Sequence, residues 1–490
     1  MSRLAAIVEA LRTGGELVRA PASLPDITGI TADTRHLTPG TLFCAVRGVA
    51  EDGHRFVAEA ARRGAAAVLV EHEVDARLPQ ILVKDGRRAA AIAATTFFNH
   101  PAARLQLVGV TGTSGKTTTV VLARHVLGAL WPTGSIGTLG AFDAAGAPVE
   151  SEAGNLTTPG PIDLQATLAA LVARGAKGAA MEVSSHSLDQ GRIDGLVFRA
   201  GIFTNLSRDH LDYHQTLDAY LAAKAKLVAY LAPDGIAVVN ADDPAWAGLP
   251  NGHRRVRFSE RANADVWADA IVASPAGSTF VLCTASGRWP VTLPLPGRFN
   301  VANALGVAGC AIALGAPPAE VARRLCSAPQ VPGRMERIAS RPCTILRDYS
   351  HKPDALERAL ETVRAFTSGR VIIVFGAGGD RDRGKRAPMG EIAVRLADVA
   401  IVTSDNPRTE DPERILDEVE AGMRGKPHHR ETDRRRAIAK ALGLAHAGDT
   451  ILLAGKGHET YQEFEDTVVP FDDRLHARET LETLGFGKGS

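Results

Sequence analysis

The 490-residue chain is poor in cysteine and in aromatic residues, and it has no excess of charge of either sign. Its five cysteines form no CxxC pair and no zinc-like spacing, which argues against a disulfide scaffold and is typical of a reducing cytoplasm. Lysine plus arginine number 56 and aspartate plus glutamate 55, a balance that argues against bulk binding of nucleic acid or of an acidic membrane. Because no 18-residue apolar run and no signal-peptide core occur, we expect a cytoplasmic protein without a transmembrane helix.

The apolar and charged fractions, 45% and 23%, are ordinary for a soluble globular protein. A single hydrophobic core stops growing near about 250–300 residues, so 490 residues should form about three domains. Short apolar runs alternate with glycine loops and helical stretches, which predicts an α/β fold. We expect a small α/β domain at 1–104, a central P-loop-type domain with a mainly parallel sheet at 105–331, and a Rossmann-like doubly wound domain at 332–490.

The strongest motif is a glycine loop between the strand-like Leu105–Val110 and a helical stretch that begins at Lys116. Backbone N–H groups of such a loop bind phosphate oxygens, with Lys116 on the β/γ-phosphates and the Thr117 hydroxyl on Mg²⁺. The loop and first helical turn consist of Gly112, Thr113, Ser114, Gly115, Lys116, Thr117 and Thr118. The strict GxxxxGK[ST] pattern fails at Val110, and the shorter TGTxGKT variant matches. The alternative is a glycine-rich turn with a solvated lysine.

Three further polar side chains follow this loop along the chain. Glu182 ends a strand-like run, where a carboxylate facing a phosphate loop is a natural Mg²⁺ ligand, although such residues are often salt-bridge partners or helix caps. His210 lies in a polar segment after the next apolar strand, Val197–Asn205. Lys224 follows on an alanine-rich helical stretch, and composition alone favours a surface lysine there.

The last third of the chain contains three strand-then-loop units. Val371–Phe375 precedes GAGGDRDRGKR, Val399–Thr403 precedes SDNPR, and Thr450–Leu453 precedes AGKGHE. Ligands bind at the carboxyl ends of the strands of an open parallel sheet. We therefore expect the three loops to converge on one site.

Ten ordered segments resemble the Mur ligase family, the ATP-dependent amino-acid-adding enzymes of peptidoglycan synthesis. They are TGTSGKTTT (111–119), MEVSSH (181–186), FTNLSRDHLDYH (203–214), YLAAKAK (220–226), GRFNVANAL (297–305), PGRMERI (332–338), DYSHKPDAL (348–356), GDRDRGKR (379–386), SDNPR (404–408) and GKGHE (455–459). The chain departs from the family pattern at Ser114, where Asn is usual, and at 350–352, where Ser-His-Lys replaces Ala-His-Thr. Neither departure removes a phosphate or metal ligand.

The resemblance implies a catalytic set of Lys116, Lys224 and His210, with ATP and Mg²⁺ as cofactors. Thr117 and Glu182 would hold one Mg²⁺, and neutral His210 with carbamylated Lys224 (N6-carboxylysine) would hold a second. The family's adenine-side segment corresponds to Asn300 and Asn303, and its nucleotide-closing loop contains Lys352 and Asp354.

The N-terminal segment Ala32-Asp33-Thr34-Arg35 resembles the uridine-nucleotide-binding segment of the members that add the third amino acid. Alone, such a segment is usually a helix cap or turn. The resemblance implies UDP contacts from Ala32, Thr34, Val49, Ala50 and Glu51. It implies contacts to the muramoyl-dipeptide end from Thr157, Thr158, Ser184, Gln190 and Arg192.

Asp405, Asn406, Pro407 and Arg408 match the motif of the diaminopimelate-adding members. The resemblance implies that Arg408 grips the distal carboxylate of meso-diaminopimelate, with Arg381 as a second cation. Gly455 and Glu459 would hold the distal ammonium and carboxylate end. Taken alone, an Asn-Pro-Arg turn is usually a loop with a solvated arginine.

The implied reaction is ATP-dependent amide formation on the D-Glu of UDP-MurNAc-L-Ala-D-Glu, through an acyl-phosphate. The partners are that nucleotide-peptide and meso-diaminopimelate, with no nucleic acid or membrane, and we expect a monomer. A folylpolyglutamate-synthase-like ligase is an alternative, and the N-terminal unit and the SDNPR loop argue against it. A P-loop switch or transport-type ATPase would leave the last three loops without a role, and a non-catalytic scaffold would not need the glycine loop.

Overall fold

The computed structural model describes residues 2–48, 51–151 and 156–486. The chain divides into two compact units, one of residues 1–259, 263–266 and 306–321, the other of 260–262, 267–305 and 322–490. Each unit is described by itself. Within the described ranges, no helix has the length and apolar character needed to cross a membrane.

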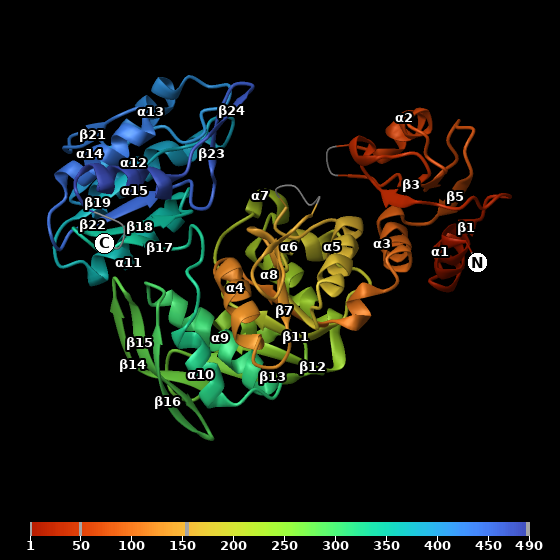
Figure 1. Ribbon diagram of the computed structural model, residues 1–490, viewed down its shortest axis with the longest axis horizontal. Coiled ribbons are helices and arrows are strands. Elements are labelled where there is room, and N and C mark those ends of the chain that lie inside the picture. The colour runs from red at the N-terminus through yellow and green to blue at the C-terminus, as the bar shows by residue number, and fades with distance from the viewer. Residues whose placement is uncertain (1, 49–50, 152–155, 487–490) are drawn as a thin grey trace. The chain divides into compact units, whose positions relative to one another are not determined.

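The first unit opens with a sheet in the order β1-β5-β4-β3-β2, which is parallel except for β1. Its elements are α1 (Arg3–Thr13), β1 (Leu17–Arg19), β2 (Gly29–Thr31), η1 (Thr34–His36), β3 (Thr41–Cys44), η2 (Gly53–Phe56), α2 (Val57–Arg62), β4 (Ala67–Val70), β5 (Gln80–Val83), α3 (Gly86–Phe97) and η3 (Pro101–Arg104). Side chains alternate across a strand: Leu42 packs with α1 and α3, and Phe43 packs with α2. In Figure 1 these helices cover opposite faces of the red and orange sheet.

The same unit contains a larger parallel sheet with β6 at its centre, in the order β7-β10-β6-β11-β12-β13. The strands are β6 (Gln106–Thr111), β7 (Thr133–Gly137), β8 (Gly140–Phe142), β9 (Pro148–Val149), β10 (Gly178–Glu182), β11 (Phe198–Phe203), β12 (Leu231–Asn240) and β13 (Arg254–Ser259). The helices and turns are α4 (Lys116–Leu127), α5 (Pro161–Ala173), α6 (Ser185–Asp189), α7 (Leu211–His214), α8 (Leu217–Ala225), η4 (Lys226–Tyr230) and η5 (Pro244–Gly248). β8 and β9 pair antiparallel at the edge. The prediction of a mainly parallel central sheet is confirmed.

After β13 the chain forms β14 (Val266–Ser274), β15 (Gly277–Thr284), β16 (Gly287–Leu293), α9 (Phe299–Ala313) and α10 (Pro318–Cys326). β15 and β16 form an antiparallel hairpin within the second unit. The sequence pattern did not predict this hairpin.

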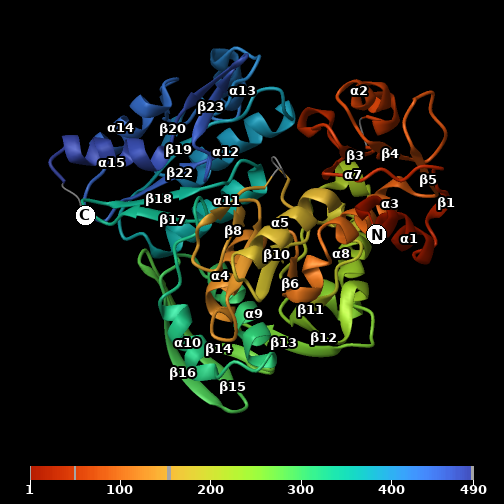
Figure 2. The same ribbon diagram turned by 45° about the vertical axis from the view of Figure 1, so that its right-hand side comes forward.

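The C-terminal sheet has the order β17-β18-β22-β19-β20-β21, and it is parallel except for β17. Its elements are β17 (Glu336–Ala339), β18 (Thr344–Asp348), α11 (Pro353–Phe366), β19 (Val371–Phe375), η6 (Arg383–Lys385), α12 (Arg386–Leu396), β20 (Val399–Val402), α13 (Pro412–Glu420), β21 (His429–Arg430), α14 (Arg434–Leu444), β22 (Thr450–Ala454), β23 (Tyr461–Phe464), β24 (Thr467–Pro470) and α15 (Asp473–Thr483). One core contains α11, α12 and α13, and the other contains α14 and α15. Figure 2 shows the strands between these helix layers, which confirms the doubly wound fold.

A buried ion pair joins the two helices of the second layer. Arg434 on α14 and Asp473 on α15 are fully buried, and the guanidinium donates two hydrogen bonds of 2.7 Å to the carboxylate. The same guanidinium donates to the Ala454 carbonyl at the end of β22, at 3.0 Å. The pair therefore fixes both helices against the strand that carries one of the predicted loops.

Asp473→Ala leaves the Arg434 charge buried without its partner, and we expect a loss of about 3–5 kcal/mol in the free energy of unfolding. Glu479→Ala on the same helix is the control. It removes an ion pair with Arg435 whose side chains are 54% and 63% exposed, worth about 0–1 kcal/mol. Urea unfolding followed by circular dichroism measures both. Equal losses would contradict the importance of the buried pair.

Candidate active site

The glycine loop between β6 and α4 is bound to the segment that follows β11. Thr113 N–H donates to the Asn205 carbonyl (2.7 Å), and Ser114 N–H donates to Asn205 Oδ1 (3.0 Å). The Thr204 hydroxyl donates to the Ser114 carbonyl at 2.8 Å. A Cβ on Gly112 (φ 148°) would lie 1.9 Å from Thr204 Oγ1, so this approach requires glycine. The loop is thus held in place at the N-terminus of α4, where phosphate oxygens can bind.

Two lysines converge on the carbonyl groups of this loop. Lys116 Nζ donates to the carbonyls of Gly112 and Thr113, both at 2.9 Å. Lys224 on α8 is 1% exposed, donates to the Gly112 carbonyl at 2.7 Å, and has its nitrogen 4.4 Å from the centre of the Tyr220 ring. Burial, and then the charge of Lys116, hold the pKa of Lys224 well below its ordinary value, which favours the neutral amine. The surface-lysine alternative is therefore wrong.

Glu182 lies beside the glycine loop because parallel pairing aligns it with Val110 of β6. Its carboxylate is buried and accepts hydrogen bonds from the N–H and hydroxyl of Thr138, at 2.9 and 3.3 Å. The Thr138 hydroxyl also lies 3.2 Å from Thr157 Oγ1. Over the described ranges the structure records no ion pair for Glu182, so the salt-bridge alternative does not apply.

His210 belongs to a cluster of aromatic rings beside Lys224. Its ring centre lies 4.8 Å from that of His186 and 6.2 Å from that of Tyr220. Nε2 of His210 is 3.6 Å from the Asp209 carboxylate. Because Tyr220 contacts both Lys224 and His210, the structure brings these two predicted ligands together around one tyrosine.

The predicted magnesium ligands suit the metal only when Lys224 is modified. In the described part of the chain no group of three or more His, Cys, Asp or Glu side chains could hold a metal ion, and the predicted set contains two such residues, Glu182 and His210. The oxygens of Thr117 and Glu182 suit Mg²⁺. Lys224 donates to a carbonyl and offers no oxygen. The set therefore suits Mg²⁺ when Lys224 carries an added carboxylate.

The residues predicted for the muramoyl-dipeptide end form one network. The buried Thr158 hydroxyl donates to the Glu182 carbonyl (2.9 Å), and Ser184 N–H donates to Thr158 Oγ1 (3.2 Å). Arg192 donates to the Thr158 carbonyl (3.1 Å) and twice to Gln190 Oε1 (3.0 and 2.7 Å). The structure thus brings this predicted group together next to Glu182.

The predicted UDP segment forms a capped turn after β2. The Asp33 carboxylate accepts the Arg35 N–H at 2.9 Å and is also paired with the Arg35 side chain, whose hydrogen bond holds the pKa of Asp33 below its ordinary value. Ala32 and Thr34 flank this cap. The turn interpretation is correct for Asp33, and the nucleotide contacts of its neighbours stay a prediction.

The second predicted UDP loop is only partly described, because 49–50 (Val49 and Ala50) lie outside the described residues. Glu51 is exposed and 3.5 Å from Arg55. Further along the chain, buried His54 contacts the Asp52 carboxylate at 2.6 Å and accepts the Glu71 N–H at 2.9 Å. His54 was not singled out from the sequence, because nothing in the sequence indicates that this histidine joins Asp52 to Glu71.

The two residues predicted for the adenine side, Asn300 and Asn303, and the two of the predicted nucleotide-closing loop, Lys352 and Asp354, belong to the second unit. Asn300 and Asn303 lie in the first turns of α9 and are buried; Asn303 donates to Asn300 Oδ1 at 3.1 Å, and Asn300 donates to the Pro296 carbonyl at 2.7 Å. Lys352 and Asp354 lie at the N-terminus of α11. Their part in nucleotide binding stays a prediction.

The loops after β19, β20 and β22 lie against one another, which confirms that they converge. Gly379 N–H donates to the Asn406 carbonyl at 2.9 Å. A Cβ on Gly379 would lie 1.9 Å from the Pro407 carbonyl oxygen, and one on Gly455 (φ 108°) would lie 2.5 Å from Asp405 Oδ2. Asp405 is 8% exposed, and within the described residues its Oδ2 has no hydrogen-bond partner. An unpaired buried carboxylate oxygen is costly, so the arrangement suits a cationic ligand group.

Arg408 is held from two sides. Its Nε pairs with Glu463 of β23 at 2.6 Å, and its NH1 donates to the Gly379 carbonyl at 2.8 Å. These contacts orient Arg408. Because a guanidinium has five N–H donors, they leave other N–H groups of Arg408 available for a ligand. Arg381 is exposed and donates to the carbonyl of its neighbour Asp380 at 3.3 Å.

Lys456 is a site residue that the sequence prediction missed. It is fully buried, donates to Asn406 Oδ1 at 2.9 Å, and lies 3.3 Å from the Glu459 carboxylate. Asn406 donates to the same carboxylate at 2.9 Å, and burial raises the pKa of Glu459. The sequence feature that could have identified Lys456 is its position between two glycines at the end of a strand.

A fixed glycine loop at the carboxyl edge of a parallel sheet, followed at once by a helix, defines a phosphate-binding α/β protein. Descriptions of Mur ligase domains match the chain in three places: the family catalytic domain at 26–105, the middle domain at 110–311 and the glutamate ligase domain at 333–457. The chain belongs to the Mur ligase family and has its three-domain architecture.

Individual relatives match over nearly the whole length. A protein from Gloeobacter violaceus named "UDP-N-acetylmuramoyl-L-alanyl-D-glutamate--2,6-diaminopimelate ligase" is 44% identical over 93% of this chain and 94% of its own length. A protein of the same name from Geobacillus thermodenitrificans is 43% identical over 93% and 94%. A solved structure of a ligase of that name has a TM-score of 0.67 and 33% identity, and the match covers 96% of this chain and 98% of that one.

Gly112→Ala places a methyl group against Thr204 in a backbone conformation that side chains rarely adopt. We expect a loss of roughly 1–3 kcal/mol in stability and weaker binding of a fluorescent nucleoside triphosphate. The control is Gly248→Ala, since a Cβ there meets open space. Thermal denaturation and nucleotide titration check both variants. Unchanged nucleotide affinity of Gly112→Ala would contradict a phosphate role for the loop.

Proposed function

We propose that the chain is an ATP-dependent ligase that joins meso-diaminopimelate to the D-Glu of UDP-MurNAc-L-Ala-D-Glu in peptidoglycan synthesis. The observation that carries the proposal is the convergence of the three loops after β19, β20 and β22. They combine an oriented guanidinium, Arg408, with the unpaired buried carboxylate oxygen of Asp405. This pair of charges complements the carboxylate and ammonium of an amino acid. The names of the relatives support the same substrate.

The chemistry explains the need for ATP. A carboxylate is not attacked directly by an amine, because its oxygen is a poor leaving group. Transfer of the γ-phosphoryl group to an oxygen of the D-Glu side-chain carboxylate gives an acyl-phosphate and ADP. The amine then forms the C–N bond, loses a proton, and expels phosphate.

Residues of the first unit suit the phosphoryl-transfer step. Lys116 and the N–H groups at the start of α4 bind phosphate oxygens and counter the charge that develops on them. Thr117, Glu182, His210 and carbamylated Lys224 would hold Mg²⁺, which when bound supplies further charge neutralisation. Arg192 and Thr158, beside Glu182, would orient the dipeptide end.

Lys224 should carry a carbamate. Its buried neutral amine can attack the carbon of CO₂, form an N–C bond and release a proton, which turns a donor into a carboxylate-like metal ligand. We expect ¹³C NMR of protein equilibrated with ¹³C-bicarbonate to show one carbamate resonance that Lys224→Arg lacks. Arginine cannot be carbamylated, so the variant should be nearly inactive. Full activity of Lys224→Arg would contradict the carbamate.

Two other functions are less well supported. A folylpolyglutamate-synthase-like ligase would not account for the family match at 26–105. A P-loop switch or transport-type ATPase would not account for the three converging loops. Phosphate release separates these cases: the proposed ligase should release phosphate only when both the nucleotide-peptide and the amino acid are present. The monomeric state and cytoplasmic location stay predictions.

The amino acid specificity tests the proposed function directly. With UDP-MurNAc-L-Ala-D-Glu and ATP, product mass should show addition of meso-diaminopimelate in preference to L-lysine, which lacks the distal carboxylate. A buried hydrogen-bonding site can reject such an analogue by on the order of 10⁴. Arg408→Ala should lose roughly 10- to 100-fold or more in kcat/KM for diaminopimelate.

The matched control is Arg414→Ala, which removes an exposed arginine from α13, the helix after the same loop. It should leave the kinetics near those of the unmodified enzyme. Comparable turnover of L-lysine and diaminopimelate by the unmodified enzyme would contradict the assigned amino acid, and it would leave the ligase reaction itself unaffected.

A further inference from the structure

The last arginine of the GDRDRGKR segment, Arg386, has no role in the reaction described above. It begins α12, and its side chain is fully buried. The guanidinium donates to both carboxylate oxygens of Glu410, at 2.8 and 2.9 Å, and to Glu418 of α13 at 2.8 Å. It also donates to the Gly378 carbonyl at 3.2 Å. Arg386 therefore connects the loop after β19 with the end of the loop after β20.

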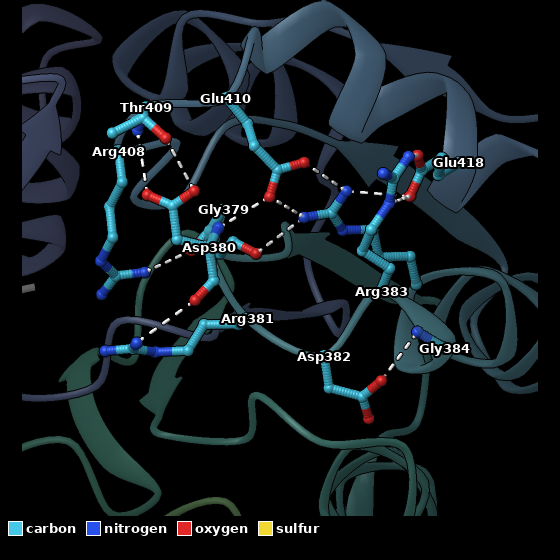
Figure 3. A network of polar contacts seen from close by, with 12 residues as sticks. Gly379, Asp380, Arg381, Asp382, Arg383, Gly384, Arg408, Thr409, Glu410 and Glu418 are labelled. Atoms are coloured by element: carbon cyan, nitrogen blue, oxygen red, sulfur yellow. Dashed lines mark hydrogen bonds and ion pairs between the residues drawn. The ribbon is translucent and has the colours of Figure 1, made fainter. Parts of the chain in front are cut away.

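Glu410 makes a second contact to the loop after β19. Its Oε1 accepts the N–H of Asp380 at 2.7 Å. The Asp380 carboxylate in turn accepts the N–H and hydroxyl of Thr409, at 3.1 and 2.8 Å. Figure 3 shows these reciprocal bonds, with Asp380 and Thr409 facing each other beside Glu410. Each loop thus donates to and accepts from the other.

Reciprocal hydrogen bonds join the loops at this point. Glycines at 378 and 379 contribute no side chain, and Asp380 and Arg408 both have left-handed backbone, at φ 52°. The hydrogen bond from Arg386 lowers the pKa of Glu410 to about 2, so the pair is ionised at neutral pH. Burying an arginine costs free energy even when it is paired. A pair of a buried guanidinium and a carboxylate that is 24% exposed is a weak source of stability, and its two parallel hydrogen bonds constrain the geometry.

We propose that Arg386 and Glu410 are positioning residues that hold the loops 376–382 and 404–410 at a fixed separation, and so place Arg408 for the amino acid substrate. The inference rests on the proposed function and goes beyond it, because it assigns Arg386 and Glu410 a role through Arg408 and not a contact with substrate. The link to Arg408 is direct: its NH1 donates to the carbonyl of Gly379 (2.8 Å), which precedes Asp380. If the Glu410 contact to Asp380 is lost, the Gly379–Asp380 peptide loses one of the bonds that fix it beside Arg408, and the guanidinium is held less precisely.

Glu410→Gln tests the proposal, because it keeps the size of the side chain and removes its charge. We expect KM for meso-diaminopimelate to rise roughly 10- to 100-fold, the size of a lost charge-assisted bond. KM for ATP and for the nucleotide-peptide should stay within about twofold, since general misfolding would raise all three. Steady-state kinetics, varying one substrate at a time, measure this split, and circular dichroism checks the fold.

Glu418→Gln is the matched control. It removes an equal charge from the same guanidinium, but Glu418 lies on α13 and bonds Arg386 and Arg383, not the backbone of either loop. Its KM for diaminopimelate should change less than about threefold. Equal effects of the two variants, or an equal rise in all three KM values, would overturn the positioning role.

Arg386→Lys is a second test of the proposal, because lysine keeps the charge and cannot bind both oxygens of Glu410 in parallel. It should raise KM for diaminopimelate as Glu410→Gln does. Failure of this inference is separable from failure of the proposed function. If the unmodified enzyme does not use diaminopimelate, the function is wrong; if it does and neither variant changes its KM, only the positioning role is wrong.

Discussion

Parallel strand pairing is the constraint on which both units depend. In the first unit, β10 and β11 flank β6 in a register that places Glu182 opposite Val110 and Phe203 opposite Thr111. The segments that follow these strands therefore start at one edge of the sheet. The glycine loop, the Glu182 carboxylate and the Thr204–Asn205 segment meet there without any long-range sequence signal. In the second unit the same geometry brings together the loops after β19, β20 and β22.

Backbone contacts and buried charges then refine what the sheet has brought together. Glycines allow approaches that a Cβ would block, as at Gly112 against Thr204 and Gly379 against Pro407. Polar groups also fix the loops at these edges. In the second unit this includes fully buried arginines, such as Arg434 with Asp473. The net free energy of such a pair relative to an apolar one is modest, although removal of one partner is costly.

Several elements follow closely from local pattern. The strand predicted from the run that ends at Asn205 is observed as β11 (Phe198–Phe203), and the helix predicted from Lys116 is α4. Their apolar periods and glycine boundaries are local, so a single sequence suffices. The β15–β16 hairpin was not predicted, because its exposed and buried residues alternate only in part. The segment around Arg55 begins as the 3₁₀ turn η2, since the Asp52 side chain caps His54 N–H at 3.0 Å.

The sequence by itself determined the family, the three-domain α/β fold and the group of loops predicted to carry the chemistry, because these depend on motifs and apolar patterns that are local in the chain. The tertiary structure alone decided the state of individual side chains. The sequence pattern favours a surface lysine at Lys224, but its nitrogen contacts the Gly112 carbonyl, and its burial lowers its pKa. Arg386 reads as one of several cations in a loop, and it is buried between Glu410 and Glu418. The physical reason is that burial and electrostatic environment arise from residues distant in the chain, which no local pattern contains.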